Sequence, residues 1–128
     1  LHDYGHFILE NPDSLVNKEK DGKHEVVGYK FLKKYFIKDV VKPIKYHVKA
    51  KRYLARDAKY YQVLSKASKV SLKLQGGIMD YKEAKEFENS EFFENSIKLR
   101  KFDEEAKKAG LKIKSINEYK NLLFSKLI

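Results

Sequence analysis

His2-Asp3-Tyr4-Gly5-His6, near the start of the 128-residue chain, is the segment around which we interpret the rest of the sequence. Imidazole suits iron and zinc, and a carboxylate can bridge two metal ions. On a helix, His2 and Asp3 would point about 100° apart, so the pair does not readily chelate a single ion. An aspartate that bridges two ions, with the histidine on one of them, removes this difficulty. The pair therefore predicts a metal centre.

Two further histidines, His24 and His47, lie downstream, so all four histidines of the chain fall within its first 47 residues. Taken singly, each is more simply explained as an ordinary surface or core residue. Taken together they are harder to dismiss, because metal ligation explains why helices of a bundle would turn histidines inward. We therefore interpret the histidines as a set.

The remaining sequence favours helices, because apolar residues recur every three or four positions and strand-like alternation is nearly absent. Gly28 leaves room for close helix packing, and Ile44 and Val48 are expected to point inward. We expect a turn at Asn11–Ser14 and an exposed loop at 17–23. The sequence therefore predicts one all-α domain over residues 1–128.

Capping residues mark where the predicted helices begin. They are Asp39, with Pro43 in the first turn, then Ser65, Asp80 with Glu83, and Ser115 with Glu118, and a further helix is expected near Asp57–Leu64. Residues 91–109 are expected to form the longest helix, closed by Gly110 in a left-handed conformation. The segment Gln75-Gly76-Gly77 is expected to shape a helix end and to take no part in chemistry.

Composition excludes several classes of protein. The absence of cysteine rules out disulfide scaffolds and thiolate metal sites, and makes a cytoplasmic setting the default. No apolar run approaches the roughly twenty residues needed to cross a bilayer, so no membrane partner is expected.

The formal charge of +10 raises nucleic acid as a partner. However, residues 1–64 and 65–128 each carry 14 basic residues, so we interpret them as a solvated surface and consider nucleic acid unlikely as a partner.

Several strings extend the pattern over nearly the whole chain. They are His24–Gly28, Pro43–Leu54, Leu64–Ser68, Ser71–Met79 and Leu99–Asp103. With the His2-Asp3 pair, which resembles the HD-domain signature, they resemble the mixed-valent di-iron oxygenases of organophosphonate catabolism. These enzymes break the carbon–phosphorus bond of hydroxylated aminoethylphosphonates and are relatives of the inositol oxygenases. The HD pair alone is weak evidence, whereas HVxAKRYL and LQGGxM together with it are specific.

The resemblance implies an HD-domain helical bundle that holds two iron ions, Fe(II) and Fe(III), and uses dioxygen as co-substrate. It implies that one iron is held by His2, Asp3 and Asp103 and the other by His24 and His47, with Asp3 as the bridge. It also places one more histidine ligand on a helix upstream of Leu1. We therefore expect the chain to lack upstream helices of the family, about fifty residues judging from the length that the resemblance implies and from ordinary domain size.

The substrate of such an enzyme is a small organophosphonate, whose oxygens need hydrogen-bond donors and positive charge. Lys51 follows His47 by four residues and Arg100 precedes Asp103 by three, so each cation shares a helix face with an expected ligand. We therefore expect both to bind substrate, and Lys51 also to act in catalysis.

The family pattern adds Ser68 as a substrate-binding hydroxyl and His6 as a catalytic residue beside the ligands or the substrate. Ser68 fits equally well as a serine in the first turn of a helix.

Three functions remain open from the sequence. The first is iron- and dioxygen-dependent cleavage of a 1-hydroxy-2-aminoethylphosphonate-type substrate to phosphate and glycine or a glycine derivative. The second is a metal-dependent HD-domain phosphohydrolase that acts on a nucleotide or phosphate monoester by activating water. The third is a non-catalytic binding protein. The strings downstream of His47 favour the first.

Overall fold

The computed structural model describes residues 1–10, 23–107 and 110–128, in which all regular elements are helices and the only β-type pairing is an isolated bridge between Phe36 and Leu127. In chain order the helices are α1 (Tyr4–Leu9), α2 (His24–Leu32), α3 (Lys38–Leu54), α4 (Ala58–Val63), α5 (Lys66–Leu74), α6 (Tyr81–Glu88), α7 (Phe93–Ala106), the 3-10 helix η1 (Ile116–Tyr119) and α8 (Lys120–Ser125). This confirms the all-α prediction. The predicted turn at Asn11–Ser14 and residues 17–22 of the predicted loop lie outside the described residues.

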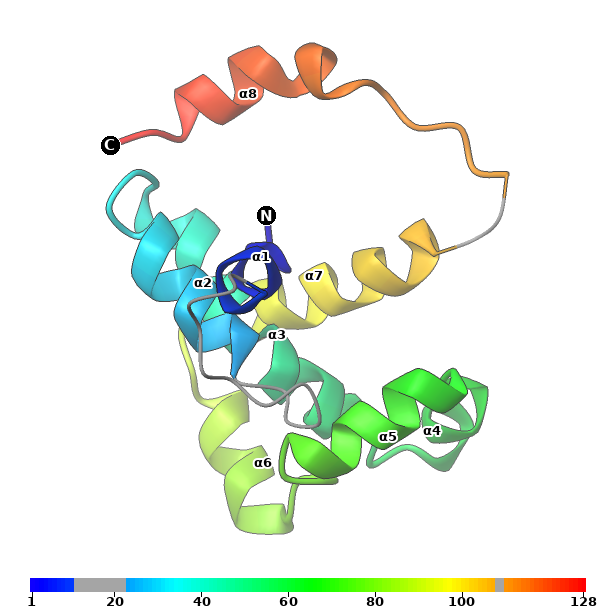
Figure 1. The fold of residues 1–128 in the computed structure, drawn as a ribbon. Coiled ribbons are helices and arrows are strands. Elements are labelled where there is room, and N and C mark those ends of the chain that lie inside the picture. Colours follow the sequence, from blue (N-terminus) through cyan, green and yellow to red (C-terminus); the bar gives the residue numbers. More distant parts are fainter. Residues whose placement is uncertain (11–22, 108–109) are drawn as a thin grey trace.

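Helix α3 is the centre of the fold, and α2 and α7 pack against it (Figure 1). The two residues expected to point inward, Ile44 and Val48, are 3% and 7% exposed. Ile44 packs with Leu32 of α2, whereas Ala50, further along α3, packs with Phe87 of α6. Burying a side chain such as Ile44 stabilises a fold by about 1.5–3 kcal/mol, so α3 carries much of the stability. None of the described helices is long and apolar enough to span a bilayer.

Helices α1 and α2 meet at a pair of glycines. A Cβ atom added to Gly5 would lie 1.8 Å from the carbonyl oxygen of His24 and 2.9 Å from the backbone nitrogen of Gly28. A Cβ added to Gly28 would lie 3.1 Å from the nitrogen of Gly5. Only glycine at position 5 allows this approach, and the close packing expected at Gly28 is confirmed. The crossing sets Asp3, just before α1, beside the first residue of α2.

Most of the predicted capping residues take that role. Ser65 accepts from the backbone N–H of Ser68. Asp57, which was not predicted as a cap, accepts from the backbone N–H of Lys59 and caps α4. Asp80 with Glu83 and Ser115 with Glu118 form capping boxes, the second of which opens η1. Gly76 and Gly77 have φ angles of +111° and +75°, so the chain leaves α5 through conformations that favour glycine.

Two expectations about helix ends are wrong. Helix α3 begins at Lys38 after Ile37, so Asp39 lies in the first turn and is not the cap, and Pro43 lies inside the helix. The reason is tertiary, because the Ile37 backbone N–H donates to the Lys126 carbonyl at 3.0 Å and so fixes where the helix starts. The longest described helix is α3, not the one predicted at 91–109.

That predicted helix is shorter than expected at both ends. It begins at Phe93, after a turn closed by a hydrogen bond from the Phe93 N–H to the Ser90 carbonyl at 3.1 Å. Its last residue is Ala106, so Gly110 does not close it directly, and residues 108–109 lie outside the described residues. Gly110 does have the expected left-handed conformation, with φ +74°.

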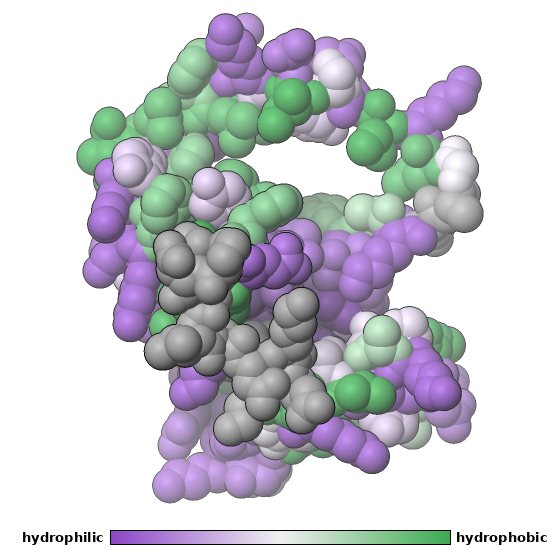
Figure 2. All heavy atoms as spheres, viewed as in Figure 1, coloured by the Kyte–Doolittle hydropathy of each residue, from purple (hydrophilic) through white to green (hydrophobic). Residues whose placement is uncertain are grey.

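Backbone hydrogen bonds near its end join the C-terminal segment, residues 110–128, to the segment between α2 and α3. The Ile128 N–H donates to the Tyr35 carbonyl at 2.9 Å, next to the hydrogen bond between Ile37 and Lys126. Figure 2 shows an opening between this segment and the helices below it. Leu122 and Phe124 are 56% and 58% exposed, so the apolar residues of α8 stay largely outside the core.

The glycine contact leads to a first prediction. Gly5→Ala should separate α1 from α2, because the new methyl group cannot share space with the His24 carbonyl oxygen. Hydrogen exchange measured by mass spectrometry should show α1 amides exchanging on the order of tenfold faster or more, while α3 and α7 keep their protection.

Gly110→Ala is the matched control, because its Cβ would contact nothing within 4 Å and it brings only left-handed strain. It should leave exchange in α1 unchanged. Unchanged α1 exchange in Gly5→Ala would contradict the role given to this contact.

Candidate functional site

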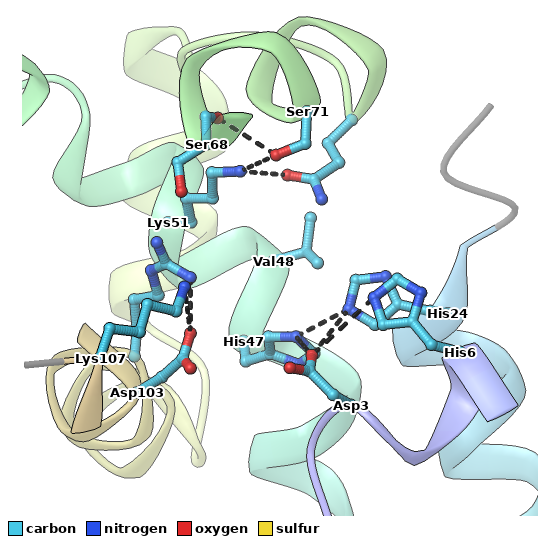
Figure 3. A pocket seen from close by; sticks show the side chains of 12 residues that line it. Asp3, His6, His24, His47, Val48, Lys51, Ser68, Ser71, Asp103 and Lys107 are labelled. Atoms are coloured by element: carbon cyan, nitrogen blue, oxygen red, sulfur yellow. Dashed lines mark hydrogen bonds and ion pairs between the residues drawn. The ribbon is translucent and has the colours of Figure 1, made fainter. Parts of the chain in front are cut away.

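The other four residues expected to bind metal come together around Asp3, and each oxygen of its carboxylate faces a different group. Figure 3 draws Asp3, His24, His47 and Asp103 but not His2. Asp3 Oδ1 lies 3.5 Å from His24 Nε2 and 3.8 Å from His47 Nε2. Oδ2 lies 3.2 Å from His2 Nε2, which is also 3.1 Å from Asp103 Oδ1. These atoms come from the segment before α1 and from α2, α3 and α7. Asp3 is therefore shared by two groups of possible metal ligands. We call Asp3, His24 and His47 the first trio, and His2, Asp3 and Asp103 the second trio.

His47, in the first trio, has the tautomer and the protonation state that a metal ligand needs. Its Nδ1 donates to the Ile44 carbonyl at 2.6 Å, so in the neutral ring Nε2 carries no proton. Burial lowers the pKa of His47 to about 4, so the ring is neutral at physiological pH. Nε2 of His47 lies 3.0 Å from Nε2 of His24. Donor atoms bound about 2.1 Å from one ion lie roughly 3 to 3.5 Å apart, so the spacing fits a metal ion.

His2 occupies the second trio as a cation between two carboxylates. The neighbouring Asp103 and then Asp3 raise the pKa of His2 to about 9. The same interaction with His2 lowers the pKa of Asp3 well below its usual range. His2 Nε2 is buried but has no hydrogen bond of regular geometry within the described residues. A buried nitrogen facing two carboxylate oxygens is a donor set that fits a divalent cation, once the His2 proton is lost.

A cavity of about 160 Å³ opens beside the first trio. In Figure 3, Asp3, His24 and His47 lie on one side, Lys51, Ser68 and Ser71 on the other, and Val48 between them. Lys51 is only 4% exposed, and its amine donates to Ser71 Oγ at 2.6 Å. This side of the cavity presents a buried ammonium and hydroxyls, which suit an anion.

Arg100 and Asp103 line the same cavity from α7. Arg100 is 5% exposed, and its Nη1 donates to Asp103 Oδ2 at 2.8 Å. Burial alone would raise the pKa of Asp103, but His2, Lys107 and Arg100 lower it overall. Asp103 is therefore held as a carboxylate, between the other members of the second trio and the part of the cavity that suits an anion.

His6 also lines the cavity, but it lies at the edge of the histidine cluster. Its ring stacks on that of His24 with centroids 3.9 Å apart, and its side chain is 48% exposed. Its Nε2 is 4.0 Å from Asp3 Oδ1. His6 is therefore placed to contact a molecule in the cavity.

Sequence reasoning missed three residues that line the cavity: Ser71, Gln75 and Lys107. Gln75 Oε1 accepts from Lys51 at 3.0 Å, so this side chain, which was expected only to help shape a helix end, also contacts a residue of the cavity. The signal was present, because Ser71 and Gln75 follow Ser68 by three and seven positions and thus share its helix face. Lys107 follows Asp103 by four, and its amine lies 3.5 Å from Asp103 Oδ2.

The cavity leads to a second prediction. Lys51→Met keeps the side-chain length but removes the ammonium, so binding of inorganic phosphate should weaken by about tenfold or more. Phosphate titration by isothermal calorimetry measures the change. Lys49→Met, on the opposite face of α3, should bind phosphate as the wild type does. Equal affinities of Lys51→Met and the wild type would rule out an anion site at Lys51.

Comparison with known proteins gives relatives that cover nearly all of the chain, although no family model matches it. The hydroxymethylphosphonate dioxygenase of Gimesia maris is 43% identical over 121 residues, which are 93% of this chain and 60% of that protein. The 1-hydroxy-2-(trimethylamino)ethyl phosphonate dioxygenase (glycine-betaine-forming) of Leisingera caerulea is 41% identical over 112 residues, 87% of this chain and 57% of that protein. An uncharacterized protein of Acanthamoeba polyphaga mimivirus is 38% identical over 130 residues, 99% of this chain and 59% of that protein.

The chain thus spans somewhat less than two thirds of the length of these relatives, between 57% and 60%. The resemblance to oxygenases of organophosphonate catabolism is confirmed by the two named relatives. Over nearly its whole length, the chain is a homologue of phosphonate dioxygenases.

Proposed function

We propose that this protein is a metal- and dioxygen-dependent enzyme that oxidatively cleaves the carbon–phosphorus bond of a small 1-hydroxyphosphonate. The observation that carries the proposal is the Asp3 carboxylate, which faces two separate groups of donor atoms next to a cavity with a buried ammonium. The named relatives act on hydroxylated phosphonates, which are anions of the kind this cavity suits. A 1-hydroxy-2-aminoethylphosphonate-type molecule is the substrate that we expect.

Two iron ions are the proposed cofactor. His2, Asp3 and Asp103 would hold one, His24 and His47 the other, and Asp3 would contribute an oxygen to each. When bound, such a pair supplies redox chemistry with dioxygen, which a set of carboxylates and imidazoles cannot supply alone. The surrounding residues keep the donors in the required state, since His47 is held neutral by burial and its tautomer is fixed by the Ile44 carbonyl.

The side chains opposite the histidines would bind the phosphonate group. Lys51, Ser68 and Arg100 would donate to its oxygens and so direct C1 and its hydroxyl toward Asp3. Lys51 would also act in catalysis, because its charge offsets the negative charge that the leaving phosphorus group gains. His6, at the cavity edge, would contact the hydroxyl end and handle its proton.

The reaction balances with dioxygen alone. One dioxygen molecule and 1-hydroxy-2-aminoethylphosphonate contain the atoms of one phosphate and one glycine. The bond between C1 and phosphorus breaks, C1 is oxidised from alcohol to carboxylic acid, and phosphorus takes up the other oxygen as phosphate. No further reductant is needed.

Phosphorus NMR of the iron-loaded protein tests the activity. Phosphate should appear from 1-hydroxy-2-aminoethylphosphonate, its trimethylammonium analogue or hydroxymethylphosphonate in air, and should not appear in an anaerobic chamber. The relative rates identify the preferred substituent. Phosphate release without dioxygen, or from a phosphate monoester alone, would instead identify a phosphohydrolase.

The shared carboxylate leads to a prediction about metal content. Asp3→Asn should lower the affinity for both iron ions, because it weakens a donor in each trio, whereas Asp103→Asn should affect only the ion beside His2. The expected loss is on the order of tenfold or more in affinity for each affected ion. Emission spectrometry of the purified proteins measures iron per chain.

Asp39→Asn, in the first turn of α3, is the control and should retain the wild-type iron content. If Asp3→Asn kept all of its iron, Asp3 would not be the bridging ligand.

A further inference from the structure

Arg100 has an unusual set of partners for a residue that lines an anion cavity. Its Nη1 donates to Asp103 and its Nε donates to Glu104 Oε1 at 2.9 Å and to the hydroxyl oxygen of Tyr60 at 3.2 Å. Its Nη2 is buried and has no hydrogen-bond partner among the described residues. The guanidinium is thus held through Nε and Nη1, and Nη2 is the nitrogen without a hydrogen-bond partner among the described residues.

Tyr60 belongs to α4, a different element from α7. Its hydroxyl donates a short hydrogen bond to the Glu104 carboxylate while it accepts from Arg100. Burial, and then Glu104, raise the pKa of Tyr60, so the hydroxyl keeps its proton. The three polar groups of Tyr60, Glu104 and Arg100 therefore form a closed triangle of hydrogen bonds.

The triangle differs from an ion pair within one helix. Glu104 and Asp103 follow Arg100 by four and three positions, so they move with α7 and cannot set its orientation toward α4. Tyr60 is the partner from another element, and its ring is anchored by packing against the cluster of Ala55, Leu64 and Leu72. An arginine fixed from two elements loses less entropy when it binds an anion.

We propose that Tyr60 is a positioning residue of the anion site: its hydroxyl holds the Arg100 guanidinium so that Nη2 is presented to the phosphonate group. The proposal rests on the function proposed above, in which Arg100 binds the substrate. Tyr60 does not touch the substrate and acts through Arg100. Its loss should therefore weaken binding of the anion with little change in the rate of the bound complex.

The test uses Tyr60→Phe in the iron-loaded full chain, with Tyr61→Phe as matched control. Tyr61 is the next residue of the same helix, packs on the same cluster and also keeps its ring, which lies under the Lys69 amine. Two readouts are measured: the Kd of inorganic phosphate by calorimetry without dioxygen, and the KM and kcat of phosphate release from the preferred phosphonate.

Tyr60→Phe should weaken phosphate binding and raise KM by about three- to tenfold, with kcat within about twofold of the wild type, as expected when one hydrogen bond to a charged group is lost indirectly. Tyr61→Phe should match the wild type in both readouts. Iron content and the midpoint of thermal unfolding should be alike in all three proteins.

Unchanged phosphate affinity and KM in Tyr60→Phe would overturn the proposal, as would the same loss in Tyr61→Phe. A wild type that does not bind phosphate would overturn it as well. A failure of the proposed function can be told apart from a failure of the positioning role. If no phosphonate is cleaved in air but Tyr60→Phe still weakens phosphate binding relative to Tyr61→Phe, the positioning role stands and the assigned reaction is wrong.

Discussion

The contact of Gly5 with the His24 carbonyl is the constraint on which the whole site depends. No side chain larger than hydrogen fits there, so α1 and α2 approach backbone to backbone. This approach brings Asp3 within 3.5 Å of His24 Nε2, and the packing of α2 on α3 then adds His47. The metal-type donors are thus assembled at a helix crossing and not within any single helix, which is why they lie far apart in the sequence.

Helix α3 serves both the core and the site with one face, because residues three, four and seven positions apart on a helix lie together. On this face Ile44 packs with Leu32 in the core, whereas His47 and Lys51, one turn apart, line the cavity together with Val48. Each buried polar group on this helix has a partner of its own, such as the Ile44 carbonyl for His47 and Ser71 for Lys51. Since unpaired buried charges are strongly destabilising, these partners are part of what allows the site to exist within a small fold.

Much of the fold and of the site follows from local sequence rules. Ser65 and Asp80 act as caps, as predicted, because capping depends on the three or four residues that follow each of them. The residues around Asp3 were predictable because their types and spacing resemble a specific pattern. Whether they bind iron stays a prediction.

What sequence reasoning missed depends on contacts between distant segments. The start of α3 is fixed by Lys126, almost ninety positions downstream, so Asp39 did not become the cap. The role of Gln75 depends on Lys51 reaching across from α3, and that of Tyr60 on Arg100 from α7. Pairings of this kind between helices leave little trace in a single sequence.

The ion pair of His2 with Asp103 joins two residues that are 101 positions apart, and so encloses most of the chain in one loop. Closing such a loop is entropically costly in an unfolded chain, but each doubling of its length adds only about 0.6 kcal/mol. The packing of α2 on α3 and of α3 on α7 offsets this entropy cost and places His2 and Asp103 side by side. Helix α1, six residues long, packs against α2, and His2, just before it, contacts Asp103 of α7. The contact of His2 with Asp103 thereby adds a direct link between the segment before α1 and helix α7 to the packing that runs through α2 and α3.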